Sequence, residues 1–305
     1  MLSSHLMAQK NGCKDINAVN YNSTATISDG SCIYPDLVLS PITSIALNEK
    51  LNETSGLTPW NGSIWTHNDS GTDTNIYALD TLGNILNSYL LKGTVNTDWE
   101  DMSQDEDYIY VGDFGNNACG CRQNLNILRI SKKSIANNAP LVDSIQFSYA
   151  NQTNFTPTIK HENTNFDCEA FIVTPDSIYL FTKEWISNKT SLYSLSKKPG
   201  KHKTNYKATL DVKGLITGAC YLPTQNKIIL CGYSQFLQPF IYLLSDFTSP
   251  NFFGGNKRRM NLSLPFHQVE AVTSINGKSV YISNEAFKKS SYINTPQKLH
   301  ILELP

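Results

Sequence analysis

The stretch Val269-Glu270-Ala271-Val272-Thr273-Ser274, followed after a short turn by Ser279-Val280-Tyr281-Ile282-Ser283-Asn284, decides the fold of this chain. Each half is a short apolar run of the kind that forms a β-strand, and the turn joins the two as a hairpin. The same hairpin pattern occurs four more times, starting at Glu53, Trp99, Cys168 and Thr217. A third strand-like run follows most of these hairpins. Repeated units of about 50 residues with up to four strands are typical of β-propeller blades.

The number and spacing of the units predict five blades. The second unit is longer than the others by an insertion of roughly 20 residues, around 131–165, which a propeller repeat tolerates in a loop. The fifth unit has no room for a fourth strand before the chain ends at Pro305, whereas a strand-like stretch, 37–47, precedes the first unit. A strand from one terminus that completes the blade at the other leaves no open sheet edge. We therefore predict an all-β, five-bladed propeller over 36–305, with 37–47 closing the fifth blade.

Composition supports this fold class and excludes several partners. The chain has 305 residues, of which 40% are hydrophobic and only 17% charged, so it has ample material for a core and few long helical patterns. Lys and Arg number 25 and Asp and Glu 26, which gives a formal net charge of −1 and no general field for polyanions. No apolar run approaches the roughly 18–20 residues that span a bilayer. We expect a monomer with no nucleic-acid polymer as partner and no membrane span.

The first 35 residues differ from the rest of the chain. Within 1–10, Leu6-Met7-Ala8 ahead of Gln9 is similar to the end of a secretory signal, the alternative being a frayed tail. Residues 11–35 are too rich in Asn, Asp and Gly to bury a core of their own. A disulfide between Cys13 and Cys32 would stabilise such a segment by roughly 3 kcal/mol. We predict that this pair is oxidised and that the protein is secreted, either extracellular or periplasmic.

Residues 12–32 resemble the small cysteine-bounded modules of secreted proteins from Bacteroidetes-type bacteria. The matching pattern runs from Gly12-Cys13-Lys14-Asp15 to Asp29-Gly30-Ser31-Cys32. This resemblance implies secretion and allows a calcium-binding loop through Asp15 and Asp29, whereas a disulfide-stapled spacer is the simpler alternative.

The remaining five cysteines lie in the propeller region. Cys220 and Cys231 are symmetrical about Gln225-Asn226, so we expect them to face each other closely enough to bridge. Cys119-Gly120-Cys121 has no second matching pair that would make a soft-metal site. We expect a loop disulfide there, with Cys168 as a further candidate partner.

A metal site is predicted on the propeller axis. The first strand of each blade lines the central channel, so residues at equivalent repeat positions converge. Three of these positions hold carboxylates, which repel each other at close range unless they are compensated. Oxygen-only ligands select Ca²⁺ or Mg²⁺ over Zn²⁺, and Ca²⁺ suits a five-fold cage with long bonds. The predicted Ca²⁺ ligands are Ser55, Glu100, Glu169, Thr217 and Glu270. The alternative is that the carboxylates cap blade backbones or line a wet channel.

The chain also resembles the calcium-activated nucleotidases, or apyrases, and related phytase-like propellers. The similarity rests on Glu53-Thr54-Ser55, 110–115, Cys168-Glu169-Ala170 and 217–223. It implies a five-bladed propeller whose axial Ca²⁺ is held by Ser and Glu side chains at these same positions. The chain departs from the family where an Arg is expected near 68–71, and only Lys183 stands in the basic region of the third blade. Phosphate binding favours Arg forks or clustered cations, so the calcium scaffold fits better than the nucleotidase activity.

Two function classes stay open. The first is a secreted, calcium-binding propeller that acts as a ligand-binding surface module, and the sequence favours it. The second is a Ca²⁺-dependent phosphohydrolase that acts on nucleotides or other phosphoesters. In either case the expected partner is a small-molecule phosphoester or a surface ligand. Trp65, Trp99 and Trp185 either stack on a sugar or base or pack between blades.

The phosphohydrolase alternative needs acid–base groups at the channel mouth. Five aspartates are expected there, at strand ends: Asp69, Asp98, Asp101, Asp113 and Asp167. Such a carboxylate can orient or deprotonate a water molecule while Ca²⁺ binds the phosphate oxygens. The candidate catalytic residues are Asp69, Asp101 and Asp113, with His67 as an acid. The alternative is that 68–71 is only a strand-end turn.

Overall fold

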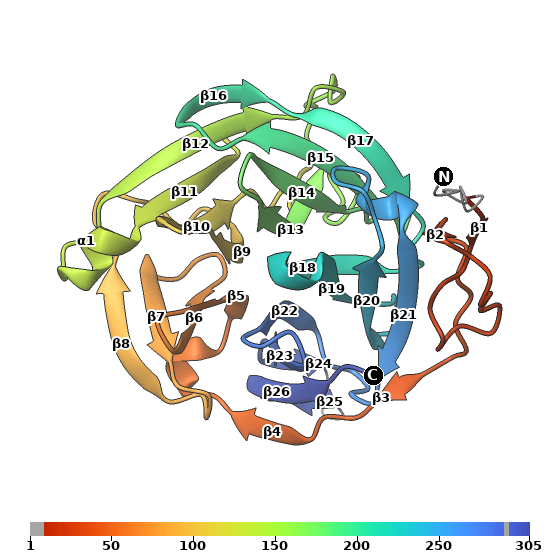
Figure 1. The fold of residues 1–305 in the computed structure, drawn as a ribbon. Helices are drawn as coiled ribbons and strands as arrows, with labels where there is room; N and C mark the ends of the chain where they lie inside the picture. Colours follow the sequence, from red (N-terminus) through yellow and green to blue (C-terminus); the bar gives the residue numbers. More distant parts are fainter. Residues whose placement is uncertain (1–8, 290–292) are drawn as a thin grey trace, which may run out of the picture.

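Five β-sheets surround a central axis in the computed structural model, which describes residues 9–289 and 293–305 (Figure 1). The predicted all-β, five-bladed propeller is therefore confirmed. Most of the proposed signal remnant lies outside the described residues. None of the helices that the structure describes is long and apolar enough to cross a membrane.

Each blade begins with the strand nearest the axis. The first blade contains β5 (Thr54–Trp60), β6 (Ser63–Asn68), β7 (Asn75–Leu79) and β8 (Ile85–Leu90). The second contains β9 (Trp99–Gln104), β10 (Tyr108–Asp113), β11 (Asn126–Ser131), β12 (Val142–Ser148) and, at the outer edge, β16 (Gly200–Lys203). The third contains β13 (Asp167–Val173), β14 (Ser177–Lys183), β15 (Thr190–Ser196) and β17 (Asn205–Leu210).

The last two blades incorporate the N-terminal strands. The fourth contains β18 (Leu215–Leu222), β19 (Lys227–Tyr233), β20 (Pro239–Ser245), β21 (Asn256–Leu262) and β3 (Val38–Leu39). The fifth contains β22 (Val269–Ser274), β23 (Ser279–Asn284), β26 (Lys298–Glu303) and β4 (Thr43–Ala46). A separate antiparallel pair, β24 (Phe287–Lys289) and β25 (Ile293–Thr295), lies between β23 and β26 in the chain. The insertion of the second blade holds helix α1 (Lys132–Ala136) and the irregular segment 149–166.

Closure of the ring differs from the prediction in one respect. β4 pairs antiparallel with β26 and completes the fifth blade, as expected. The earlier part of the 37–47 stretch does not join that blade, because β3 pairs parallel with β21 in the fourth blade. Pro41 separates the two strands, and a proline, which has no N–H, cannot continue a sheet ladder. One stretch therefore links the last two blades.

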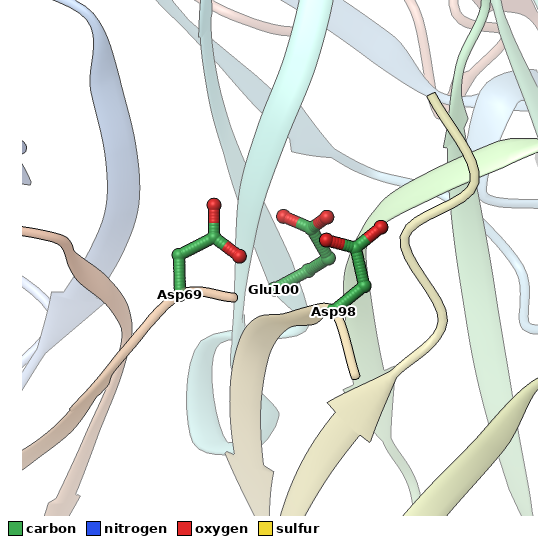
Figure 2. A group of neighbouring side chains, drawn as sticks. All are labelled: Asp69, Asp98 and Glu100. Carbon is green, nitrogen blue, oxygen red and sulfur yellow. The ribbon is translucent and has the colours of Figure 1, made fainter. Parts of the chain in front are cut away.

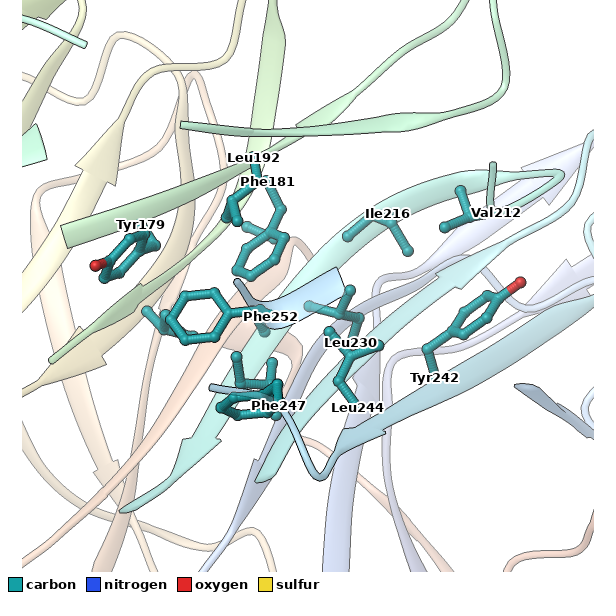
Figure 3. Close-up of a cluster of buried hydrophobic side chains, with 14 of the residues drawn as sticks. Tyr179, Phe181, Leu192, Val212, Ile216, Leu230, Tyr242, Leu244, Phe247 and Phe252 are labelled. Atoms are coloured by element: carbon teal, nitrogen blue, oxygen red, sulfur yellow. The ribbon is translucent and has the colours of Figure 1, made fainter. Parts of the chain in front are cut away.

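Apolar side chains fill the spaces between neighbouring blades. The cluster between the third and fourth blades includes Phe181, Leu230 and Leu244, all fully buried (Figure 3). A similar cluster between the first two blades buries Trp65 and Trp99, which therefore pack between blades. This packing holds the five inner strands at fixed positions around the axis.

Two disulfides are present. Cys13–Cys32 joins the N-terminal segment, where β1 (Asn11–Gly12) pairs with β2 (Ile27–Ser28), so the predicted bridge is confirmed. Cys119 bonds Cys121 within its loop, while Cys168 is a free, buried thiol. Asp15 accepts hydrogen bonds from Tyr34 and Asn17, and Asp29 accepts one from the backbone of Ser31.

The expected Cys220–Cys231 bridge is wrong, since both thiols are free. A 3-10 turn, Pro223–Gln225, and Asn226 close the hairpin, which places Leu222 opposite Lys227. In that register Cys220 faces Ile229, and Cys231 faces Gly218. The centre of the hairpin thus lies one residue earlier than the sequence symmetry suggested.

Candidate metal centre

The acidic side chains of the channel mouth come from two kinds of strand end. The inner strand of each blade begins at this face, and the antiparallel second strand ends there. Asp98 immediately precedes β9, whereas Asp69 follows β6 and Glu285 follows β23. Antiparallel pairing therefore brings together residues from both the start and the end of each hairpin.

A β-bulge occurs at the same place in all five hairpins. In the third, fourth and fifth blades the extra residue is Glu169, Thr217 and Glu270, respectively. In the second blade, Glu100 and Asp101 occupy the irregular position. A bulge interrupts the alternation of side chains and re-aims them. In the first blade the irregular position holds Gly56 and Leu57, directly after Ser55. The bulge therefore re-aims Glu100, Glu169, Thr217 and Glu270, whereas Ser55 pairs regularly with His67.

A cavity of about 110 Å³ lies at this end of the axis, and Glu100, Glu169 and Glu270 are among the residues that line it. Six carboxyl side chains line it: Asp69, Glu100, Glu162, Glu169, Glu270 and Glu285. Lys183, at the end of β14, is the single cationic side chain among the described residues that line it. The cavity therefore carries an excess of acidic groups in a largely buried setting.

Three carboxyl groups have the spacing of a cation site. One oxygen from each of Asp69, Asp98 and Glu100 lies within 4.8 Å of the others, and Figure 2 shows the three groups side by side. Twice a Ca²⁺–oxygen distance of about 2.4 Å is about 4.8 Å, so these oxygens can share one coordination sphere. Glu100 also belongs to a second group of this kind, with Asp167 and Glu169.

The second group is already satisfied by protein donors. Asp167 accepts hydrogen bonds from the backbone N–H of Asn116 at 2.6 Å and from the indole N–H of Trp185 at 2.7 Å. Lys183 Nζ lies 2.9 Å from Glu169 Oε1, and both side chains are about 5% exposed. The second group therefore has less need of a cation.

Glu100 differs from these neighbours. Its side chain is only 4% exposed, and within the described ranges its carboxylate has no hydrogen-bond or ion-pair partner. The Glu270 carboxylate, 7% exposed, has no such partner there either. A buried carboxylate without compensation is unfavourable, so a cation or a proton is expected beside Glu100.

Burial shifts the acid–base equilibria of the cavity. It raises the pKa of Asp69 to about 7 and, together with the Asp167 charge, the pKa of Asp98 to about 6. Burial also raises the pKa of Glu285 to about 8 and, against the opposing Lys183 charge, that of Glu169 to about 7. Without a cation, the cavity holds protons near neutral pH. A bound divalent ion would replace them.

Gly115 provides the space in which the cluster sits. A Cβ at this position would overlap Glu100 Oε1 and Asp98 Oδ2. Arg122 fixes the same loop by donating to the Gly115 carbonyl at 2.7 Å and to Asp113 Oδ1 at 2.8 Å. The backbone can therefore approach the two carboxyl groups closely only because residue 115 has no side chain.

The predicted ligand set is only partly gathered around the cavity. Ser55, Glu100, Glu169 and Glu270 line it, but Thr217 does not. The hydroxyl of Ser55 donates to the Glu100 carbonyl, and that of Thr217 donates to the Val269 carbonyl at 2.5 Å. Both hydroxyls thus connect one inner strand to the next.

Of the four candidate catalytic residues, Asp69 alone lines the cavity among the residues described. Asp113 pairs with Arg122, and Asp101 accepts backbone hydrogen bonds deep inside the ring. His67 is fully buried against Trp99, and burial lowers its pKa to about 4. Its Nδ1 lies 3.0 Å from the Asn68 carbonyl. These contacts give Asp101, Asp113 and His67 internal structural partners.

Sequence reasoning placed Asp98 at the channel mouth without assigning it as a ligand, and it missed Glu285 and Tyr233. The sequence could have indicated Glu285, because it directly follows the second strand of the fifth blade, just as Asp69 directly follows the second strand of the first blade. Trp185 and Tyr233 lie under the Lys183 ammonium, with ring centroids 4.7 Å and 5.4 Å from Nζ. Trp185 is therefore part of the cavity wall.

Together, the fold and the site define a five-bladed propeller with an acidic axial cavity. No model of a known protein family matches the chain, and no curated protein matches its sequence. Among solved structures, the calcium-binding protein regucalcin from Agrobacterium tumefaciens strain C58 is similar over 88% of this chain and 97% of its own, with 10% identity and a TM-score of 0.47. A chain of the mitotic checkpoint complex is similar over 88% and 96%, with 10% identity and a TM-score of 0.43. Similarity at this level does not bear on function.

Proposed function

We propose that this chain is a secreted calcium-binding β-propeller that acts as a ligand-binding module. The Glu100 carboxylate carries this proposal, because it is buried, lacks a protein partner in the described ranges and has oxygens of Asp69 and Asp98 within 4.8 Å. Carboxylate-only ligation favours hard cations over Zn²⁺. The cavity of about 110 Å³ suits an ion with its water molecules rather than a large organic ligand.

We infer calcium rather than magnesium because Ca²⁺ tolerates an irregular set of ligands. The three carboxylates come from two blades, and two of them, Asp69 and Glu100, share their cavity with the oxygen atoms of Ser55 and Glu270. Ca²⁺ accepts six to eight oxygens at variable angles, whereas Mg²⁺ demands a near-ideal octahedron. The ion would therefore stabilise the junction between the first two blades.

A wider cleft of about 370 Å³ adjoins the acidic cavity and offers a place for a ligand. The two spaces share Glu162, Trp185, Tyr233 and Gln268 in their walls. The amide oxygen of Gln268 is buried without a hydrogen-bond partner in the described structure. A ligand in this cleft would contact aromatic faces and reach the bound ion from the side.

Thermal unfolding with and without Ca²⁺ tests the proposed cation site. An ion that binds only the folded ring should raise the melting temperature, and the gain in stability is about 2.7 kcal/mol at 100 times Kd. Glu100→Gln should lower the Ca²⁺ affinity at least tenfold and so reduce the rise in melting temperature. Glu303→Gln, at an exposed position on β26, should leave both unchanged. Equal melting temperatures in Ca²⁺ and in chelator would refute the calcium site.

A second candidate is a Ca²⁺-dependent phosphohydrolase. Lys160 and Lys289 line the cleft beside the acidic cavity, so cations are closer to the site than the sequence indicated. In this alternative the ion and the lysines would bind phosphate oxygens, and Asp69 would orient the attacking water. Release of inorganic phosphate from nucleoside triphosphates or phytate in millimolar Ca²⁺, abolished in Asp69→Asn, would select the enzyme over the module.

The two disulfides support the secreted location, since such bonds persist in oxidising compartments. Peptide mapping of protein from the native host, alkylated before lysis, tests this point. Recovery of Cys13 and Cys32 as alkylated thiols would contradict secretion.

A further inference from the structure

The opposite end of the propeller axis holds a second and larger cavity. Its volume is about 560 Å³, and it is lined by the far ends of all five inner strands. The walls include the apolar side chains of Leu57, Met102 and Val173, which are themselves almost completely buried. The acidic centre lies at the starts of the same strands, so this funnel is a separate site.

Two hydroxyl groups in the funnel wall lack adequate partners. Thr58 and Thr273 are 3% and 1% exposed. In the described parts of the chain, Thr58 Oγ1 has no hydrogen-bond partner, and the sole contact of Thr273 Oγ1 is the Cys220 sulfur at 4.0 Å. A hydroxyl that lines a cavity without a protein partner bonds to water or to a ligand there. They can therefore orient a polar group of a molecule whose apolar body contacts the walls.

The rim of the funnel is acidic. Asp105, Glu106 and Asp107 line one side, and Lys197 is the cationic residue that lines it within the described ranges. Lys197 is already paired with Asp105 at 2.7 Å, and nearby Lys132 donates to the Gln104 side chain at 2.6 Å. Glu106 and Asp107 are exposed and have no ion-pair partner in the described structure. The rim thus complements a positive charge.

From this arrangement we infer that the funnel binds a small amphipathic amine. The apolar or aromatic body lies against Leu57, Met102 and Val173, and a hydroxyl on that body bonds to Thr58 or Thr273. The ammonium group lies at the rim beside Glu106 and Asp107. Apolar walls with a few placed polar groups are the usual composition of small-molecule sites.

Calorimetry or ligand-observed NMR with three matched probes at pH 7 tests this inference. Tyramine carries both the phenol and the ammonium, phenethylamine lacks the phenol, and 3-(4-hydroxyphenyl)propionate replaces the ammonium with a carboxylate. For a probe of this size we expect a Kd of about 1 mM or below for tyramine. Phenethylamine should bind several-fold more weakly, and the carboxylate at least tenfold more weakly.

Variants assign the two polar contacts. The double variant Glu106→Gln/Asp107→Asn should weaken the binding of both amines at least fivefold. The double variant Thr58→Val/Thr273→Val should weaken tyramine binding without affecting phenethylamine. Asp36→Asn, in the exposed linker, should bind tyramine as the native protein does. Equal affinity for all three probes, or no binding of tyramine at about ten times the expected Kd, would overturn the inference.

Discussion

The Lys183 ammonium lies 2.9 Å from the Glu169 carboxylate, inside a cavity where Glu100 has no equivalent partner in the described structure. One lysine cannot compensate the six carboxyl groups that line this space. The ion pair therefore satisfies the third blade. At the junction of the first two blades, Arg122 Nη1 lies 3.9 Å from Asp98 Oδ2, but Glu100 is left to a cation or to protons. This asymmetry is the reason that we place the proposed ion beside Glu100 rather than at the centre of the five inner strands.

Removal of the lysine should separate its role from that of the metal. In Lys183→Met, the buried Glu169 carboxylate loses its partner. In the presence of chelator at pH 8, we expect this variant to be about 3 kcal/mol less stable than the native protein. The Ca²⁺-dependent rise in melting temperature should become larger, because the net negative charge of the cavity increases. Lys197→Met, which breaks the more exposed pair with Asp105, should leave the Ca²⁺ effect unchanged. A smaller Ca²⁺ effect in Lys183→Met would contradict this account.

Stability without the ion should fall as the pH rises. Burial raises the pKa of Asp69 to about 7 and that of Asp98 to about 6, so the folded state binds more protons than the unfolded state between about pH 4 and 7. Stability therefore decreases through this window, by at most about 1.4 kcal/mol per pH unit for each carboxyl group, and the lowered pKa of buried His67 offsets part of the decrease below about pH 6.5. Urea unfolding in chelator at pH 5, 6.5 and 8 measures the decrease. Saturating Ca²⁺ should reduce it, and greater stability at pH 8 than at pH 5 in chelator would be inconsistent with these shifts.

Gly115 should be required for cation binding. The methyl group of Gly115→Ala would displace the Glu100 and Asp98 carboxyl groups, so we expect Ca²⁺ affinity to fall at least tenfold. Gly62→Ala is the control, because no atom lies within 4 Å of a Cβ at that turn. This variant should lose about 1 kcal/mol of stability from its positive φ and keep its Ca²⁺ affinity. Equal Ca²⁺ affinity in the two variants, by titration calorimetry, would remove Gly115 from the site.

Asp101 should be structural rather than catalytic. Its carboxylate accepts hydrogen bonds from the backbone N–H groups of Met102 at 2.7 Å, Phe171 at 3.0 Å and Ala219 at 3.2 Å, and so connects three blades. Asp101→Asn places an amide N–H₂ against at least one of these donors, and we expect a loss of about 3 kcal/mol in urea unfolding. Asp36→Asn, at an exposed position, should change stability little. Native stability with lost phosphate release in Asp101→Asn would reverse this assignment.

The blades could be predicted from the sequence because two features are visible there: the strand–turn–strand pattern within each unit, and the recurrence of that pattern along the chain. Alternating strands and short turns identify each hairpin, and the missing fourth strand of the fifth unit identifies the closing strand. The division of 37–47 between two blades depends on Pro41 and on packing against β21, which periodicity does not report. The Cys220–Cys231 error has a similar origin, because a 3-10 turn shifts the hairpin register without changing its apolar pattern.

The site was harder to predict than the fold. Equivalent repeat positions indicated Glu100, Glu169 and Glu270, and the shared bulge explains why these positions face the axis. Sequence symmetry treats the five positions alike, yet the actual environment is asymmetric. Lys183 pairs with the carboxylate of the third blade alone, through Glu169. The Thr217 hydroxyl of the fourth blade donates to the Val269 carbonyl of the fifth. The Asp98 and Glu100 carboxyl groups both lie against the backbone of Gly115, a loop residue, and the repeat pattern does not predict this contact.

The position of the ion tests the central claim most directly. Crystals grown in millimolar CaCl₂ and measured at long wavelength would locate Ca²⁺ by its anomalous scattering. We predict one peak bounded by Asp69, Asp98 and Glu100, with oxygens about 2.3–2.6 Å away. The same peak should be missing from crystals of Glu100→Gln. A peak held instead by Glu169 and Glu270, or only water between Asp69, Asp98 and Glu100 at saturating Ca²⁺, would contradict the proposed centre.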